Sequence, residues 1–463
     1  MNYSSCGSNF VLFQCYETLK MSKPKFLLLN KLAGVLLISL LFLFLPGASF
    51  AQTTQLGITS IERYTLPTIE LGAAQKVVPG AVNDRGLHLG GIFSGLYHPQ
   101  GEPENVFYAI ADRGPNSRIT VGKKRRRTFA VPSYNPTIYK LSVAGDHIQI
   151  IDATPILTST NQPVTGLPNT NNDEFPYTYD GKTRLQLNPN GLDSEALARA
   201  TDGTFWIGDE YSPSFVQIAP DGKVMHRLIP AGMTLSSDTD VHSVLPAIYA
   251  KRRLNRGFEG LTISQNGKSV FAALQSPLDF PTKNIGRASR MIRLLVLDTQ
   301  KLKPVAEYVY VAEAASSFGA TKQGKIKIGD LAFVNPTTLL VVERTNKVAH
   351  IYQVGLGSAT NILGTRWSDP HNTTGVLEAL TREQLEANSI TPVSKSLLVD
   401  LSQIPEMPKK IEGLTIVNSK AIALGNDNDF GFDRFDAKGR AVNNNLPSEL
   451  LILRLGQALP LAR

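Results

Sequence analysis

The sequence predicts an all-β protein that forms a single β-propeller. One pattern recurs five times along the chain, each copy holds two short apolar runs joined by a turn, and few segments have helical periodicity. A repeated four-stranded unit with tight turns is typical of propeller blades. Each copy begins with a small or acidic residue, here called the head, and ends in polar residues. The heads open the triplets Ser94-Gly95-Leu96, Glu195-Ala196-Leu197, Glu259-Gly260-Leu261, Asp330-Leu331-Ala332 and Glu412-Gly413-Leu414.

The clearest copy runs from Gly191 to Val224. Apolar residues alternate up to a turn at Asp202-Gly203, and a β-type run then leads to the acidic pair Asp209-Glu210. Asp-Gly between two such runs is a strong hairpin signal, because Gly accepts the positive φ that a tight turn needs. The segment therefore predicts an antiparallel meander with carboxylates at the ends of its strands.

Further β-type runs after each copy complete four strands per blade. A strand over Arg63–Ile69 is expected to pair with Leu450–Leu455 and close the ring. We favour six blades, with the sixth between Thr128 and Pro189, and keep five open. The alternative fold is a β-sandwich with a second domain, but a sandwich has no reason to repeat an acidic head.

One or two short helices and several inserted loops are expected outside the blades. The segment 376–387 has apolar residues at helical spacing, and 240–253 is a second candidate with Asp240 as its N-cap. The loops cover Arg118–Asn135 and Thr158–Pro189.

The N-terminal segment has the pattern of a Sec signal peptide. Lysines precede an apolar run over Leu32–Leu45, and small residues before Gln52 fit a signal peptidase. We predict a signal peptide over 1–51 and one propeller domain over 52–463. A start at Met21 would make residues 1–20 an extension, and it would leave the mature chain without cysteine, because both cysteines precede Met21.

Charge argues against a nucleic-acid partner. The chain carries a net +8; residues 1–51 hold four Lys and one Glu, so the mature charge is 8 − 3 = +5. Five positive charges lie together at Lys123–Arg127, where a solvated loop is a more ordinary explanation than a patch that attracts an anion. Isolated histidines are interpreted as structural or surface residues: His88, His98, His242, His350 and His371.

Acidic heads on the innermost strands would form one ring around the propeller channel. Carboxylates crowded in this way repel one another, and a hard cation such as Ca²⁺ would relieve the repulsion. We predict a Ca²⁺ site with the ligands Glu195, Glu259, Asp330, Glu412, Asp427 and Asp429. The alternative is that each acid only caps a turn or binds backbone amides.

Polar strand ends supply the candidate catalytic groups. Asp209, Glu210 and Glu343 could act as a base, and Arg113 and Arg344 could hold an anionic substrate or merely neutralise neighbouring acids. The predicted catalytic set is Asp112, Arg113, Asp209, Glu210, Glu343 and Arg344. No G-x-S-x-G, H-E-x-x-H, P-loop or G-x-G-x-x-G motif competes with this interpretation.

The same residues resemble a known family, the exported proteins with a phytase-like domain described as having esterase-like activity. The matching stretches are 110–116 with Ala111-Asp112-Arg113-Gly114, 193–195 with 206–211, 255–261 with Arg256-Gly257-Phe258-Glu259, and 410–414 with 426–431. The resemblance covers nearly all of residues 52–463. Where the family pattern has Gly after the second acidic head, this chain has Ala196.

The resemblance implies kinship with calcium-dependent propeller phosphatases. We therefore expect an exported, Ca²⁺-dependent phosphoester hydrolase that acts as a monomer on a small anionic or ester substrate, in the periplasm, the medium or a thylakoid lumen. No membrane span is expected in the mature chain. The alternatives are a non-enzymatic propeller that binds a ligand or protein, and a lactonase or carboxylester hydrolase.

Overall fold

The computed structural model describes residues 57–74, 84–170, 172–372 and 375–462. The predicted signal peptide lies outside these residues and stays a prediction. The described chain is nearly all β, as expected, with three α-helices of four to six residues. No described helix is long and apolar enough to cross a membrane.

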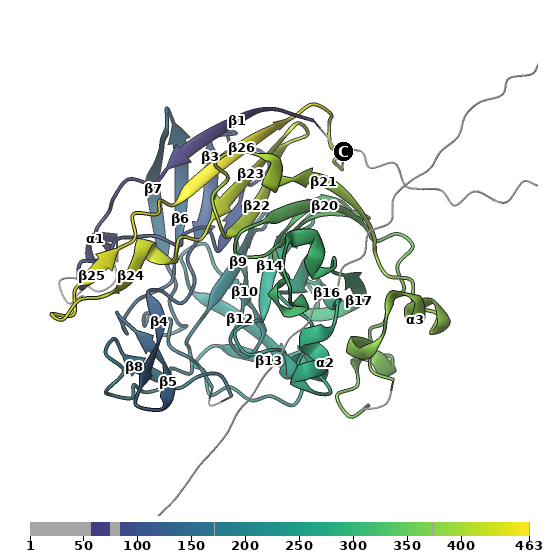
Figure 1. Cartoon of the computed structure of the whole chain (residues 1–463), viewed down its shortest axis with the longest axis horizontal. Helices are drawn as coiled ribbons and strands as arrows, with labels where there is room; N and C mark the ends of the chain where they lie inside the picture. The colour runs from purple at the N-terminus through teal and green to yellow at the C-terminus, as the bar shows by residue number, and fades with distance from the viewer. Residues whose placement is uncertain (1–56, 75–83, 171, 373–374, 463) are drawn as a thin grey trace, which may run out of the picture. The chain divides into compact units, whose positions relative to one another are not determined.

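Five groups of four antiparallel strands, here called blades 1 to 5, make up the fold (Figure 1). Blade 1 contains β2 (Gly95–Tyr97), β3 (Val106–Ile110), β6 (Thr137–Ala144) and β7 (His147–Pro155). Blade 2 contains β9 (Ser194–Arg199), β10 (Phe205–Asp209), β11 (Ser214–Ile218) and β12 (Val224–Pro230), and it adds β13 (Asp240–Leu245) as a fifth strand.

The remaining blades follow the same order. Blade 3 contains β14 (Phe258–Ile263), β15 (Ser269–Leu274), β16 (Met291–Asp298) and β17 (Lys303–Val311). Blade 4 contains β18 (Lys327–Asn335), β19 (Thr338–Arg344), β20 (Ala349–Gly355) and β21 (Ser394–Asp400). Blade 5 contains β22 (Ile411–Asn418), β23 (Ala421–Asn426), β26 (Glu449–Leu455) and the N-terminal β1 (Ile58–Thr65).

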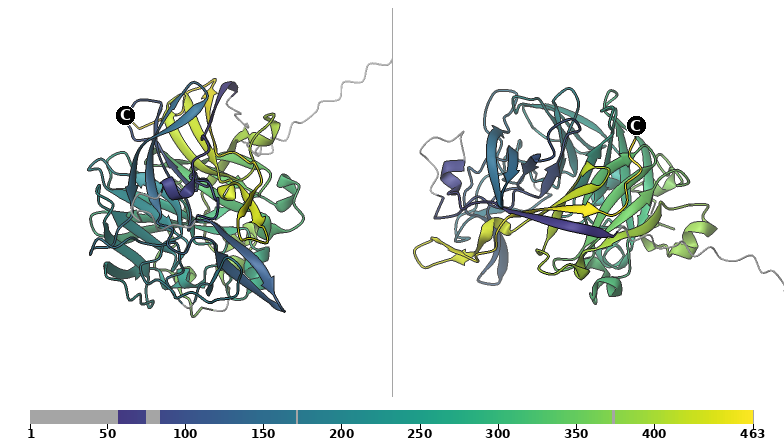
Figure 2. Two further views of the ribbon diagram at one scale, coloured as in Figure 1. Left: turned by 90° about the vertical axis from the view of Figure 1, so that its left-hand side faces the viewer. Right: turned by 90° about the horizontal axis from the view of Figure 1, so that it is seen from above.

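The expected pairing of the two chain ends is confirmed, but the N-terminal strand covers Ile58–Thr65 instead of the predicted Arg63–Ile69. β1 pairs antiparallel with β26, with Arg63 opposite Leu451 and Tyr64 opposite Leu450. The two strands lie side by side in Figure 1 and again in the view from above (Figure 2). Because strands from both ends of the chain pair in blade 5, this blade is complete and the ring is closed.

The first strands of the blades form the innermost layer. Each of these five strands contacts the next in the cycle β2, β9, β14, β18, β22 and back to β2. Small residues permit this approach: a Cβ on Gly260 would lie 2.9 Å from the Asp330 Cα, and one on Gly413 would lie 2.6 Å from the Leu96 Cβ. Close packing of the inner strands therefore explains the glycine after the two heads Glu259 and Glu412.

The favoured sixth blade is not confirmed. The segment 128–189 contains β6 and β7, which complete blade 1, and β8 (Pro176–Thr178). β8 pairs with β5 (Lys124–Phe129), whose hairpin partner is β4 (Asn116–Val121). The long head-to-head spacing thus comes from the β4–β5 hairpin, inserted between β3 and β6, and from β8 in the connection between blades 1 and 2. Five blades remain in the described chain.

The helical segments only partly match the expectations. Residues 376–387 contain η5 (Leu377–Ala379) and α3 (Arg382–Ala387), which begins with a capping box at Thr381. The helix expected from Asp240 is wrong: β13 occupies this position, and η1 (Ala247–Lys251) follows it. Parallel pairing with β12 satisfies the backbone of this segment in place of a helix.

The other described elements lie between blades or in their loops. They are α1 (Leu71–Ala74), α2 (Lys283–Ala288), η2 (Ala315–Phe318), η3 (Gln323–Lys325), η4 (Arg366–Ser368), η6 (Leu401–Gln403), η7 (Asp429–Gly431), and the hairpin of β24 (Phe432–Phe435) with β25 (Ala441–Asn443). Apolar side chains from neighbouring blades fill the space between the sheets, as where Phe215 of blade 2 packs on Phe258 of blade 3 with ring centroids 4.3 Å apart.

Candidate functional site

Acidic side chains from several blades meet where the inner strands begin. Glu195, Glu259 and Glu412 are each the second residue of an inner strand. They line one cavity of about 270 Å³. Its other acidic residues are Asp112, Glu210, Asp427 and Asp429. We call this the acidic cavity.

Basic side chains line the same cavity in equal number. Beside the seven carboxylates stand seven cationic groups: Arg113, Arg118, Arg127, Arg253, Arg256, Lys327 and Lys410. Arg118 and Arg127 come from the β4–β5 hairpin and both pair with Glu174, at 2.6 Å for Arg127. One residue of the basic run 123–127 is therefore built into the site. A cavity with both signs of charge can hold a cation and an anion next to each other.

Three carboxylates stand close enough to share one cation. One oxygen from each of Glu195, Glu210 and Glu259 lies within 4.8 Å of the others. The Glu210 Oε1 and the Glu259 Oε2 are buried and accept no hydrogen bond. Buried carboxylate oxygens are rarely left without a partner, so the donor set fits a hard cation such as Ca²⁺.

Crowding and burial favour the protonated forms of two of these acids, Glu259 and Glu195. Burial, followed by the charges of Glu412 and Glu210, raises the pKa of Glu259 to about 8. Burial, with Asp193 and Glu259 close by, raises the pKa of Glu195 well above its usual range. A bound cation would reverse this preference, because it stabilises the ionised carboxylates.

A second group of carboxylates shares Glu195 with the first. Asp112, Asp193 and Glu195 also offer oxygens within 4.8 Å of one another. Burial, and then the charge of Asp427, raises the pKa of Asp112 to about 7. Asp112 follows β3 and receives a hydrogen bond from the Gly114 N at 2.8 Å. A carboxylate with this pKa is suited to accept a proton near neutral pH.

Arg113 is a buried ion-pair partner of the acids around it. Its guanidinium pairs with Asp193 and with the Glu210 Oε2, the latter at 3.2 Å. The Arg113 side chain is 3% exposed. These contacts agree with the simpler alternative for Arg113, charge neutralisation. Asp193 is one of these two partners; it belongs to a motif that matches the family, but it was not among the predicted site residues.

Arg344 joins the acidic heads of two blades. Its Nη2 lies 3.0 Å from the Glu259 Oε1 of blade 3 and also contacts Glu412 of blade 5. The side chain is fully buried and does not line the acidic cavity. A Cβ on Gly329 would lie 3.3 Å from the Arg344 Nε, so the arginine lies next to the residue of blade 4 that corresponds to Glu259 and Glu412.

Blade 4 has glycine where blades 3 and 5 have glutamate. The acid and the glycine are interchanged between the two strand starts, which read Phe258-Glu259-Gly260-Leu261 in blade 3 and Ile328-Gly329-Asp330-Leu331 in blade 4. Neighbouring residues of a strand point to opposite faces, so this interchange turns Asp330 away from the cavity. Asp330 instead accepts backbone hydrogen bonds from Leu261 at 3.3 Å, Leu331 at 2.8 Å and Leu414 at 2.9 Å.

Two further predicted residues lie outside the acidic cavity. Asp209 accepts hydrogen bonds from the Asp193 N at 3.0 Å and from the Ser214 Oγ at 2.6 Å. Glu343 is buried in blade 4, where it accepts from the Tyr310 hydroxyl at 2.6 Å and the Lys395 Nζ at 2.9 Å. Both carboxylates accept their hydrogen bonds within the fold.

Two lysines of the site were not identified from the sequence. The Lys410 Nζ lies 2.5 Å from Asp427 and 2.6 Å from Asp429. Burial, with Arg344 and Arg256 nearby, lowers the pKa of Lys327 to about 7. Lys410 directly precedes β22 in a left-handed backbone conformation, with φ 54°, so the alternation of a strand does not predict where its side chain lies. No sequence signal marks either lysine.

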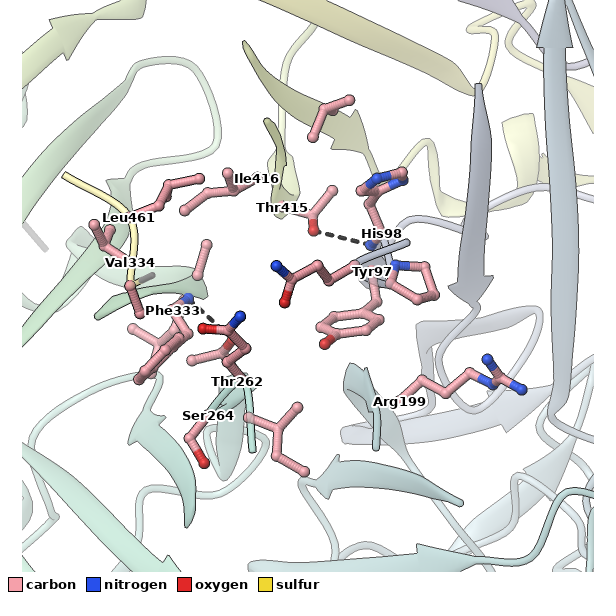
Figure 3. Close-up of a pocket in the computed structure, with 18 of the residues that line it drawn as sticks. Tyr97, His98, Arg199, Thr262, Ser264, Phe333, Val334, Thr415, Ile416 and Leu461 are labelled. Carbon is pink, nitrogen blue, oxygen red and sulfur yellow. Dashed lines mark hydrogen bonds between the residues drawn. The ribbon is translucent and has the colours of Figure 1, made fainter. Parts of the chain in front are cut away.

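The opposite ends of the inner strands enclose a different cavity of about 450 Å³ (Figure 3). We call it the neutral cavity. Thr262 and Thr415 stand at equivalent strand positions there and accept hydrogen bonds from the Phe333 N at 3.1 Å and the His98 N at 2.9 Å. Among the described residues that line it, none is a carboxylate, and Arg199 lies at its edge.

The chain belongs to the phytase-like family, described as having esterase-like activity of phytase, which it matches over residues 88–430. It is 27% identical over 282 residues to an uncharacterized secreted protein of Arthroderma benhamiae. That match covers 52% of this chain and 55% of the relative, so the chain spans about half the length of this curated relative.

Solved structures with a similar arrangement have little sequence identity to this chain. The PQQ-bound aldose sugar dehydrogenase of Streptomyces coelicolor is 10% identical, with a TM-score of 0.32, over 85% of this chain and 98% of the other. The Dos1 propeller is 7% identical, with a TM-score of 0.30, over 73% and 68%. The description of the propeller therefore rests on the sheets of this protein itself.

Proposed function

We propose that this protein is an exported, metal-dependent hydrolase of phosphoric esters, with its active site in the acidic cavity. The observation that carries the proposal is the group of Glu195, Glu210 and Glu259, with two buried oxygens that lack a partner. Membership of the phytase-like family supports the reaction class. The secreted relative and the predicted signal peptide support export.

Glu195, Glu210 and Glu259 would hold the metal, with Asp112 and Asp193 beside Glu195. The other predicted ligands that line the cavity are Glu412, Asp427 and Asp429. Lys410 already forms ion pairs with the two aspartates. When bound, Ca²⁺ would bind an ester oxygen and stabilise the charge that develops on it.

The chain's own groups would bind and orient the substrate. Arg256 and Arg127 line the cavity beside the acids, and a guanidinium can bind a phosphate through two parallel hydrogen bonds. Arg256 also donates to the Ser276 Oγ at 2.8 Å, which fixes its direction. Asp112 is the candidate base: its carboxylate lines the cavity beside Glu195 and could accept the proton of an attacking water.

The test is turnover of p-nitrophenyl phosphate and phytate by the purified protein after chelation, with and without added Ca²⁺. We expect activity only with the metal, and a loss of about 100-fold or more in kcat for Asp112→Asn, the usual scale for a general base. Glu259→Gln should weaken activation by Ca²⁺. Glu386→Gln, an exposed acid on α3, is the matched control and should leave both unchanged.

Two outcomes would contradict the proposal. Hydrolysis of carboxylesters or lactones without any phosphoester turnover would favour the alternative esterase. Ca²⁺ binding at Glu259 without turnover on any ester would favour a propeller that binds a ligand or protein.

A further inference from the structure

Two histidines and an aspartate gather on the outer edge of blade 2, away from the acidic cavity. β13 pairs in parallel with β12, and His226 lies opposite Asp240 in this register. His242 follows two residues later on the same strand as Asp240. The two strands thus bring His226, Asp240 and His242 together from positions up to 16 residues apart in the sequence.

The three ligand atoms form a compact triangle. The Asp240 Oδ2 lies 2.9 Å from the His226 Nδ1 and 2.8 Å from the His242 Nε2. The two imidazole nitrogens are 3.3 Å apart. A single ion about 2.0–2.2 Å from each ligand, the usual range for zinc with nitrogen and oxygen, can reach all three vertices of such a triangle.

The triangle is accessible to solvent. The side chains of His226, Asp240 and His242 are 28%, 57% and 32% exposed. An ion entering from outside would keep one position for water, the arrangement of zinc sites with three protein ligands.

The donor set differs from that of the acidic cavity. Imidazole nitrogen suits zinc and related transition metals, whereas Ca²⁺ takes oxygen ligands in larger number. We propose that His226, Asp240 and His242 bind a divalent transition-metal ion of the zinc type. The ion would join β13 to β12 and stabilise the strand that extends blade 2 beyond four strands.

The experiment uses tag-free protein stripped of metal, because a polyhistidine tag would bind zinc itself. Zn²⁺ is titrated by calorimetry, and Co²⁺ provides an optical spectrum of the bound ion. Loss of even an outer-shell partner costs about 10–100-fold in metal affinity, so His226→Gln and His242→Gln should each weaken Zn²⁺ binding at least that much. Both should also abolish the Co²⁺ spectrum.

The controls separate this site from others in the chain. His147→Gln removes an exposed imidazole that lies 3.2 Å from Asp146, and it should change nothing. Glu259→Gln should leave Zn²⁺ binding intact while it affects Ca²⁺ in the acidic cavity. Excess Ca²⁺ should not displace Zn²⁺, and Zn²⁺ should raise the Tm of the wild type but not that of His242→Gln.

Unchanged Zn²⁺ affinity in both folded histidine variants would overturn the proposal. So would binding that Ca²⁺ displaces or that Glu259→Gln removes, since the ion would then sit in the acidic cavity. Circular dichroism of each variant establishes that it is folded, and Asp240→Asn, which keeps the size of the side chain, provides a third independent variant.

Discussion

The two cavities at the ends of the inner strands differ in charge although the same strands build both. The acidic cavity has seven carboxylates and seven cationic groups, whereas the described lining of the neutral cavity has no carboxylate. In blades 3 and 5 the two cavities lie three residues apart along one inner strand, from Glu259 to Thr262 in β14 and from Glu412 to Thr415 in β22. The repeat therefore places ionisable groups at one end of the strands and hydroxyl groups at the other.

The difference shows which residues the fold itself requires. At the neutral cavity, Thr262 and Thr415 each accept a hydrogen bond from the backbone of another blade. At the acidic cavity, Glu210 and Glu259 keep oxygens without any partner. Buried polar groups left unsatisfied cost stability, and a bound ion or a catalytic role is one explanation for them.

The largest effect should come from removing the cation that holds the acidic heads together. Arg344→Met would leave Glu259 and Glu412 buried without their shared partner, at a cost of about 3–5 kcal/mol. Arg199→Met at the neutral cavity loses only cation–π contacts with Tyr108 and Phe205, worth about 1 kcal/mol. Urea unfolding measures both.

Adding Glu412→Gln to Arg344→Met should recover part of the lost stability, because one unpaired charge disappears. Equal costs for the two arginine substitutions would mean that the acidic cavity is no more dependent on charge pairing than the neutral one.

An intermediate effect is expected from pH in the metal-free protein. The folded pKa of Glu259 is raised from 4.5 to about 8 and that of Asp112 from 3.8 to about 7. At these two residues the folded state therefore holds protons that the unfolded state has released, so their contribution to stability is greatest at low pH and falls between about pH 5 and pH 8. Lys327 acts in the opposite direction from about pH 7 upward, because its pKa is lowered in the folded state.

Denaturation midpoints at several pH values in metal-free buffer measure this slope. Glu259→Gln should flatten it, while Thr262→Val at the neutral cavity should not. A midpoint that rises from pH 5 to pH 8 in the wild type would show that the acids of the cavity are already ionised without a cation.

The smallest effect should come from the threonines of the neutral cavity. Thr415→Val leaves the buried His98 N–H without its acceptor, and Thr262→Val does the same for Phe333, at roughly 1–3 kcal/mol each. Thr201→Val, an exposed residue of the same cavity, should stay within about 0.5 kcal/mol. Thermal unfolding is the measurement, and losses at Thr201 equal to those at Thr415 would contradict the assigned role.

Much of the fold could be predicted from local patterns, and the site only in part. Alternating apolar runs and Asp-Gly turns can be recognised from a few neighbouring residues. For this reason the inner hairpins and the pairing of β1 with β26 were predictable. Blade number was not, because the β4–β5–β8 sheet lengthens the spacing between the first two heads without adding a blade. The strand at Asp240 was missed because its pairing partner β12 lies beyond a loop.

The sequence by itself determined that acidic heads recur at the starts of the inner strands, and that Glu195, Glu259 and Glu412 belong to one set. Tertiary structure decided which acids share a cavity. In blade 4 the acid and the glycine are interchanged, so Asp330 accepts hydrogen bonds from backbone amides. Arg344 lies beside Gly329, the residue that corresponds to Glu259 and Glu412. Side-chain direction in a strand follows the pleat and the register, and these are settled only when neighbouring blades pack together.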